Sequence, residues 1–140
     1  MYLQLLIDKT DVLIEEYKMI RSEALASIGE IVEVVTEYDG DYIGELIDNV
    51  YFGSVSVVKI LACTRYPSQR TIMFKFNNYE RWPLIYGSIE TFPVESIKLF
   101  CGAIPDYYEL MPTVLETTFL VETEADRQIY ERHKKHLDSR

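Results

Sequence analysis

The sequence predicts an α+β fold with an N-terminal amphipathic helix, a small antiparallel SH3-like β-barrel or curled sheet, and a C-terminal helix. Three observations lead to this class. Residues 31–76 hold runs rich in Val, Ile, Tyr, Phe and Thr, which suit a half-buried pleated sheet. Turn signals separate the runs, first at Asp39-Gly40, where Gly accepts a positive φ without steric cost. Stretches with helical periodicity lie before and after this region.

Length and composition predict a single domain over residues 1–140. A chain of 140 residues with 48% hydrophobic and 26% charged residues is typical of one globular unit. Cys63 and Cys101 lie far apart and outside any C-x-x-C spacing, so we expect free thiols in a cytoplasmic protein. The N-terminus has no basic, cleavable leader pattern, and no apolar run approaches the length of a membrane span. We therefore expect neither export nor a membrane partner.

Residues 1–28 are expected to form the first helix. Their apolar side chains recur at i, i+3/i+4 spacing, and Gly29 follows as a typical residue at the end of a helix. The sequence leaves one alternative open here. In it, residues 2–7 form a short strand and the helix begins at Thr10 or Asp11, either of which can cap it.

Residues 30–100 are expected to form the barrel-like sheet. The run 54–66 changes phase at Val57-Val58 and is apolar on both sides, which predicts a central strand with a bulge. Because a curled central strand among short neighbours is how a small barrel closes, an SH3-like barrel is the favoured architecture. After Asp39-Gly40, the predicted reversals are Asp48-Asn49 with Gly53, and Pro67-Ser68. The further predicted segments are strands at 71–76 and 83–89 and a short turn or strand at 94–100.

The last part of the chain is expected to contain a loop and a helix. Residues 101–122 are predicted as a surface loop, with a further strand as an option at 114–121. Thr123 is a good N-cap for a helix over 123–138, which has acidic residues in its first turn and basic residues near its end. Its apolar stripe is thin, so we expect light docking.

Charge is segregated along the chain. Residues 29–49 contain seven acidic side chains and no Lys or Arg, whereas residues 50–81 contain five basic side chains and one acidic. One interpretation is that acidic and basic strands lie side by side and pair. The other is that the acidic hairpin faces solvent and docks a basic partner. The residues predicted for that docking face are Glu37, Asp39, Asp41 and Glu45.

These observations favour a noncatalytic binding or adaptor protein that acts through a protein partner or its own copies. The net charge of −9 argues against nonspecific attraction of the whole molecule to nucleic acid. An alternative is a nucleic-acid or phosphate-ligand binder, because aromatic residues interleave with the basic ones. Its candidate residues are Lys59, Arg65, Arg70, Lys75 and Arg81. A third alternative is an enzyme of unrecognised chemistry.

No cofactor or metal is expected. His133 and His136 lie one helical turn apart, but further ligands are missing, so a solvated helix tail is the favoured interpretation. Cys63 falls inside an apolar strand, where a thiol stays protonated. Trp82 precedes Pro83 and is therefore held extended, which is typical of a residue that anchors a core edge or an interface, and we favour the core edge.

Overall fold

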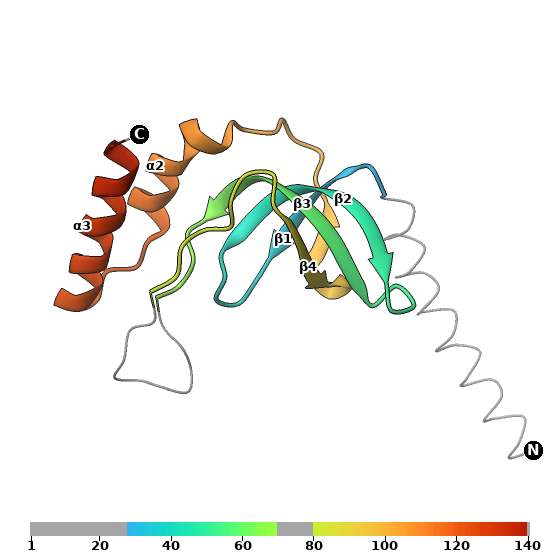
Figure 1. Cartoon of the computed structure of the whole chain (residues 1–140), viewed down its shortest axis with the longest axis horizontal. Coiled ribbons are helices and arrows are strands. Elements are labelled where there is room, and N and C mark those ends of the chain that lie inside the picture. The colour runs from blue at the N-terminus through green and yellow to red at the C-terminus, as the bar shows by residue number, and fades with distance from the viewer. Residues whose placement is uncertain (1–27, 70–79, 140) are drawn as a thin grey trace, which may run out of the picture.

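The computed structural model describes residues 28–69 and 80–139, which form an antiparallel sheet of five strands with two helices at one end (Figure 1). The strands lie in the order β4-β3-β2-β1-β5. They are β1 (Ile31–Val35), β2 (Asp41–Val50), β3 (Val55–Arg65), β4 (Ile89–Pro93) and β5 (Ile97–Leu99). The helices are α2 (Tyr107–Thr118) and α3 (Glu124–Asp138), and a 3-10 turn (Val94–Ser96) joins β4 to β5. The predicted α+β class is confirmed.

The prediction of a closed barrel is wrong. Within the described residues the edge strands β4 and β5 pair only with β3 and β1, not with each other. Both edges are short, since β4 has five residues and β5 three. The predicted short turn or strand at 94–100 is confirmed by the 3-10 turn and β5. The predicted helix at 1–28, its strand alternative, and the predicted strand at 71–76 lie outside the described residues.

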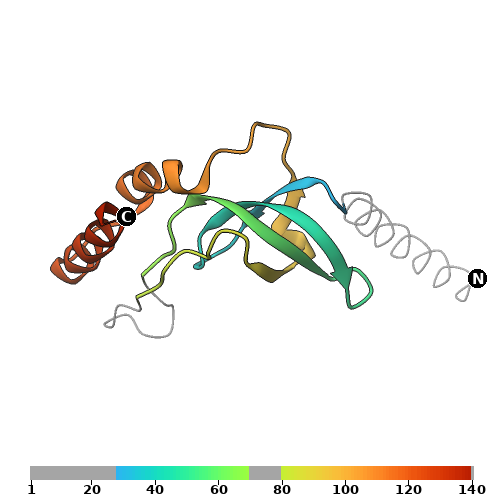
Figure 2. The same ribbon diagram turned by 45° about the horizontal axis from the view of Figure 1, so that its top comes forward.

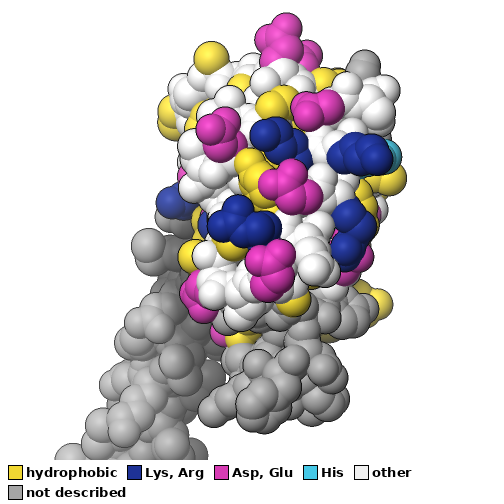
Figure 3. Space-filling view, turned by 90° about the vertical axis from the view of Figure 1, so that its left-hand side faces the viewer, with side chains coloured by type: hydrophobic (Ala, Val, Ile, Leu, Met, Phe, Trp, Pro, Cys, Tyr) yellow, Lys and Arg dark blue, Asp and Glu magenta, His cyan; other side chains and the backbone are white. Residues whose placement is uncertain are grey.

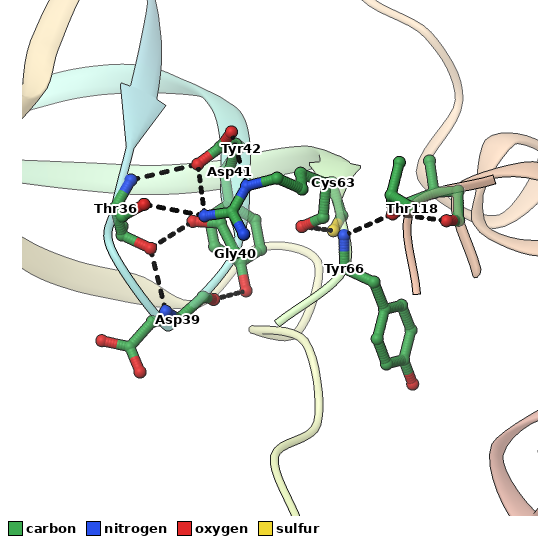
Figure 4. A network of polar contacts seen from close by, with 10 residues as sticks. Thr36, Asp39, Gly40, Asp41, Tyr42, Cys63, Tyr66 and Thr118 are labelled. Carbon is green, nitrogen blue, oxygen red and sulfur yellow. Dashed lines mark hydrogen bonds and ion pairs between the residues drawn. The ribbon is translucent and has the colours of Figure 1, made fainter. Parts of the chain in front are cut away.

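The Asp39-Gly40 reversal is confirmed and joins β1 to β2. Gly40 has φ +91°, and a Cβ there would lie 2.7 Å from the carbonyl oxygen of Arg65, so only glycine fits. The Thr36 N–H donates to Asp41 Oδ1 at 3.0 Å, and the Tyr42 hydroxyl donates to the Asp39 carbonyl (Figure 4). The turn is therefore held by its own side chains as well as by the strand ladder.

The second reversal lies later than predicted. Asp48 and Asn49 are still in β2, and the turn comes at residues 51–54. Tyr51 and Phe52 adopt φ values of 52° and 59°, a region that bulky residues rarely occupy. Gly53 lies in this turn as predicted, with φ 83°, but turn rules place Asp and Asn at positive φ, so the sequence placed the start of the turn too early.

The β2–β3 pair is curled by three register shifts. One lies opposite Val57 and Val58, as predicted, but the extra residue is Ile47 in β2, because Leu46 pairs with Val58 and Asp48 with Val57. Strand β3 is internal, also as predicted. At Gly44 a Cβ would lie 2.4 Å from Val58, so the absence of a side chain allows the two strands to approach.

The predicted strand at 83–89 is wrong, because β4 begins only at Ile89. The backbone of Leu84 forms hydrogen bonds with side chains instead of with a neighbouring strand. Its N–H donates to the Tyr42 hydroxyl at 3.1 Å, and its carbonyl accepts from the Tyr107 hydroxyl at 2.6 Å. Sheet-like hydrogen bonds start at Gly87, which donates to Ile60 at 2.7 Å.

The prediction of a loop and optional strand over 101–122 is wrong for residues 107–118, which form α2. Asp106 caps this helix by accepting from the N–H groups of Tyr108 and Glu109, each at 3.0 Å. Pro112 lies inside the helix and cannot donate an i→i−4 bond. The helix persists because one face packs into the core. The buried residues of that face are Tyr107, Met111, Val114 and Leu115.

The predicted C-terminal helix is confirmed as α3, with Thr123 as N-cap in a capping box with Asp126. Asp126, Ile129 and His133 of this helix are buried, whereas most of its other residues are exposed. Helices α2 and α3 lie side by side near the C-terminal end of β3, away from the turn at 51–54 (Figures 1 and 2). Among the described residues, neither helix is long and apolar enough to cross a bilayer.

Candidate functional site

A fully buried histidine holds α3 against the rest of the molecule. The His133 side chain is 0% exposed, and its ring stacks on Trp82 with centroids 3.6 Å apart and planes 12° apart. Its Nδ1 is hydrogen-bonded to the Tyr66 hydroxyl, and its Nε2 lies 2.8 Å from Glu80 Oε1. We call Tyr66, Glu80, Trp82 and His133 the histidine cluster.

The electrostatics of this cluster assign its protons. Burial raises the pKa of the Tyr66 phenol, so the hydroxyl is protonated and donates to His133 Nδ1. Desolvation lowers the pKa of His133, which favours the neutral ring with its proton on Nε2, donated to Glu80. Burial would raise the pKa of Glu80, but hydrogen bonds from His133 and Arg132 outweigh it, so this pKa is lowered.

The contacts of the histidine cluster suit it to hold α3 in place rather than to transfer protons. Both ring nitrogens of His133 are engaged, and Trp82 covers a face of the ring. The predicted solvated tail is therefore wrong for His133, whereas His136 is exposed and meets Trp82 edge-on at 5.1 Å. A sequence signal for His133 existed, because it lies on the helical stripe that also contains Ile129 and Leu137.

A groove with aromatic walls lies beside the cluster and has a volume of about 580 Å³. We call it the aromatic groove. Trp82 in its wall is 47% exposed, Tyr108 53% and Ile85 70%. Its lining residues are Tyr66, Trp82, Pro83, Ile85, Tyr107, Tyr108, Met111, Pro112, His136 and Leu137. The prediction that Trp82 anchors a core edge is thus only half of its role, because its other part lines this groove.

The side chains that form the walls of the groove are held in place by contacts with neighbouring residues. The Tyr107 ring is held by its hydroxyl bond to Leu84 and by an edge contact with Tyr108, whose ring centroid is 5.1 Å away. Tyr86 adjoins both tyrosines, with centroids 6.0 Å from Tyr107 and 6.1 Å from Tyr108. The groove is therefore formed before any ligand arrives.

The four residues of the predicted acidic docking face lie in different environments in the structure. Asp41 is bidentate to Arg65, with N–O distances of 2.9 and 3.1 Å, and its side chain is only 18% exposed. Figure 4 shows Asp41 beside Thr36 at the β1–β2 turn. The expectation that all four carboxylates face solvent is thus wrong for Asp41, and strand-to-strand pairing describes it better.

The other three carboxylates lie in different settings. Asp39 is 71% exposed at its side chain and lies 3.7 Å from Arg81 Nε. Glu37 is exposed, and Glu45 is half-buried opposite Lys59 in the strand register.

The predicted anion-binding residues that the structure describes either have protein partners or are half-buried. Arg65 donates to Asp41 and to the Thr36 carbonyl at 2.7 Å. Arg81 donates to the Ser68 carbonyl at 2.7 Å, and its guanidinium lies 5.7 Å from the centre of the Tyr38 ring. Lys59 is half-buried. Arg70 and Lys75 lie outside the described residues.

Cysteine and metal chemistry have little support in the described part of the chain. Cys63 and Cys101 are both free, as predicted. Burial raises the pKa of the Cys63 thiol to about 12, so it stays protonated at neutral pH. Within residues 28–69 and 80–139, no three His, Cys, Asp or Glu side chains gather in a metal-binding arrangement.

The helical end also presents a mixed-charge surface. Figure 3 shows this end of the molecule, where Lys and Arg side chains alternate with Asp and Glu. Such interspersed charges are typical of a solvated face rather than of a docking patch of one sign.

Fold and site together define a small α+β protein whose open sheet carries a helical pair and an aromatic groove at one end. No family model matches the chain, and no curated protein matches it. Among solved structures it is similar to the X-ray crystal structure of kinase-associated protein B from Bacillus cereus, with 32% identity and a TM-score of 0.56. The match covers 80% of this chain and 91% of that one. By this identity and coverage, the chain belongs to the same family as kinase-associated protein B.

Proposed function

We propose that this chain is a noncatalytic adaptor that binds a protein partner through the aromatic groove. The observation that carries the proposal is the partial exposure of large apolar side chains around a preformed cavity. Trp82, Ile85 and Tyr108 are each about half exposed or more. Aromatic residues in such positions supply binding energy at protein interfaces, and gathered exposed apolar side chains mark interaction surfaces.

The partner class comes from the family. The related structure is that of a kinase-associated protein. We therefore propose that the partner is a protein kinase or a member of a kinase's complex, and that the two meet in the cytoplasm, where the free thiols would persist.

Rigidity supports binding at this site. The histidine cluster and the Tyr107–Leu84 hydrogen bond hold the groove walls, so few side chains need to be ordered when a partner docks. The predicted nucleic-acid alternative has weaker support, because Arg65 and Arg81 already donate to Asp41 and Ser68 and a phosphate would have to displace those contacts.

Site-specific photocrosslinking in living cells tests the proposal. A photoreactive residue at position 85 or 108 should give a discrete adduct with a kinase or a kinase-bound protein, identified by mass spectrometry. The matched controls are Leu120, 64% exposed, and Tyr51, 76% exposed, which do not line the groove. Equal adducts from all four positions, or adducts from the control positions alone, would contradict binding through the groove.

A further inference from the structure

The segment of residues 80–85 separates two cavities. On one side is the aromatic groove, and on the other is a cavity of about 650 Å³ between this segment, the β1–β2 turn and β4. Trp82 lines both cavities. The two cavities therefore adjoin at this one side chain.

The second cavity is acidic. Among the described residues, four carboxylates line it, from Glu37, Asp39, Glu80 and Glu90, and one cation, from Arg81. Arg81 is only 18% exposed at its side chain and is held by the Ser68 carbonyl and by Asp39. We call this cavity the acidic cavity.

Two of its carboxylates have no cationic partner within the described part of the chain. Glu80 is directed to His133 and Arg132, and Asp39 lies 3.7 Å from Arg81. For Glu37 and Glu90, no ion pair occurs among the residues that the structure describes, and Glu37 interacts with the hydroxyl of its neighbour Tyr38. The described residues that line this cavity therefore carry a net negative charge.

A second copy of the chain does not suit this surface. The molecule carries a net charge of −9, and a symmetric dimer about Trp82 would bring the acidic cavities of both copies close together. An acidic partner would meet the same repulsion. A partner segment with both apolar and cationic side chains can place the apolar ones in the aromatic groove and the cationic ones in the acidic cavity.

We infer that the groove's partner segment is basic: an apolar side chain enters beside Ile85, and lysine or arginine side chains extend past Trp82 into the acidic cavity. This inference rests on the proposed function and specifies the chemistry of its partner. The apolar contact supplies the desolvated anchor, and the carboxylates speed association and reject acidic segments.

Trp82 provides the measurement, because it is the single tryptophan of the chain. Three short peptides without tryptophan share a central Leu-Phe-Leu and differ only in flanking lysines, glutamines or glutamates. Titrated into the full chain at low salt, the lysine peptide should shift Trp82 emission and bind at least about tenfold more tightly than the glutamate peptide. High salt should reduce this preference.

Two double variants test the role of the carboxylates. Glu37→Gln with Glu90→Gln should weaken the lysine peptide about three- to tenfold at low salt and little at high salt. Glu116→Gln with Glu131→Gln makes the same change of net charge at exposed positions outside the cavity, and should leave the affinity nearly unchanged. Equal loss from both double variants would overturn the inference, because the effect would then be one of total charge.

The groove itself is tested separately. Ile85→Glu should abolish the response of Trp82, whereas Leu120→Glu should not. If the three peptides bind equally and Ile85→Glu still abolishes binding, the basic partner is refuted while binding through the groove stands. If the lysine peptide leaves Trp82 emission unchanged, the inference is overturned, and crosslinking from position 85 still decides the proposed function independently.

Discussion

The substitution Tyr66→Phe tests whether the histidine cluster fastens α3 to the sheet. It removes one hydroxyl and keeps the ring that packs on Phe119, whose centroid is 5.5 Å away. His133 Nδ1 then lacks its donor. Because His133 is 0% exposed and Tyr66 2%, water cannot easily take the place of the lost hydroxyl.

The size of the effect follows from that burial. Leaving a buried acceptor without a partner costs about 1–3 kcal/mol, which for a chain of this length lowers Tm by roughly 4–12 °C. Urea unfolding at neutral pH measures the change in free energy of unfolding, and amide hydrogen exchange locates it. Exchange should quicken in α3 more than in β2, since the lost bond joins α3 to the segment that follows β3.

Tyr86→Phe is the matched control. It removes the same hydroxyl from a ring that is 49% exposed, and within the described residues this hydroxyl makes no hydrogen bond. We expect its free energy of unfolding to stay within about 0.5 kcal/mol of the unmodified protein. If both variants unfold alike, or if exchange in α3 is unchanged in Tyr66→Phe, the cluster does not fasten the helix.

Two further predictions concern acid stability and the second turn. Desolvation lowers the pKa of His133 in the folded chain, so below about pH 6.5 the unfolded chain binds more protons, and the free energy of unfolding should fall as the pH drops. Urea titrations between pH 8 and pH 5 should show this fall, and a flat profile would contradict the neutral, buried ring. At the second turn, Tyr51→Asn with Phe52→Gly places residues that tolerate positive φ at 52° and 59°, and should raise the free energy of unfolding by about 0.5–1 kcal/mol. Thermal melts measure this change, and a lower Tm would mean that the two aromatic side chains stabilise the fold.

The local features of the fold could be predicted from short stretches of sequence. The Asp39-Gly40 turn follows from the backbone freedom of one glycine, and the start of α3 follows from the Thr123–Asp126 capping box. The α+β class follows from the change between periods of two and 3.6 residues. Helix α2 escaped prediction because Pro112 and the neighbouring Thr and Val disfavour a helix locally, whereas its buried face is decided by packing on the sheet.

The candidate site depends on contacts between distant parts of the chain. Tyr66 and His133 are 67 residues apart, and Glu80 and His133 are 53 residues apart. The sequence showed that charge is segregated along the chain, and the periodicity of each strand or helix limited which side chains share a face. Which of those faces meet is decided only when β3, the segment 80–85 and the two helices pack together. Tertiary packing thus paired Asp41 with Arg65, buried His133 and left Trp82 between an aromatic and an acidic cavity, because burial and ion pairing are properties of the assembled chain.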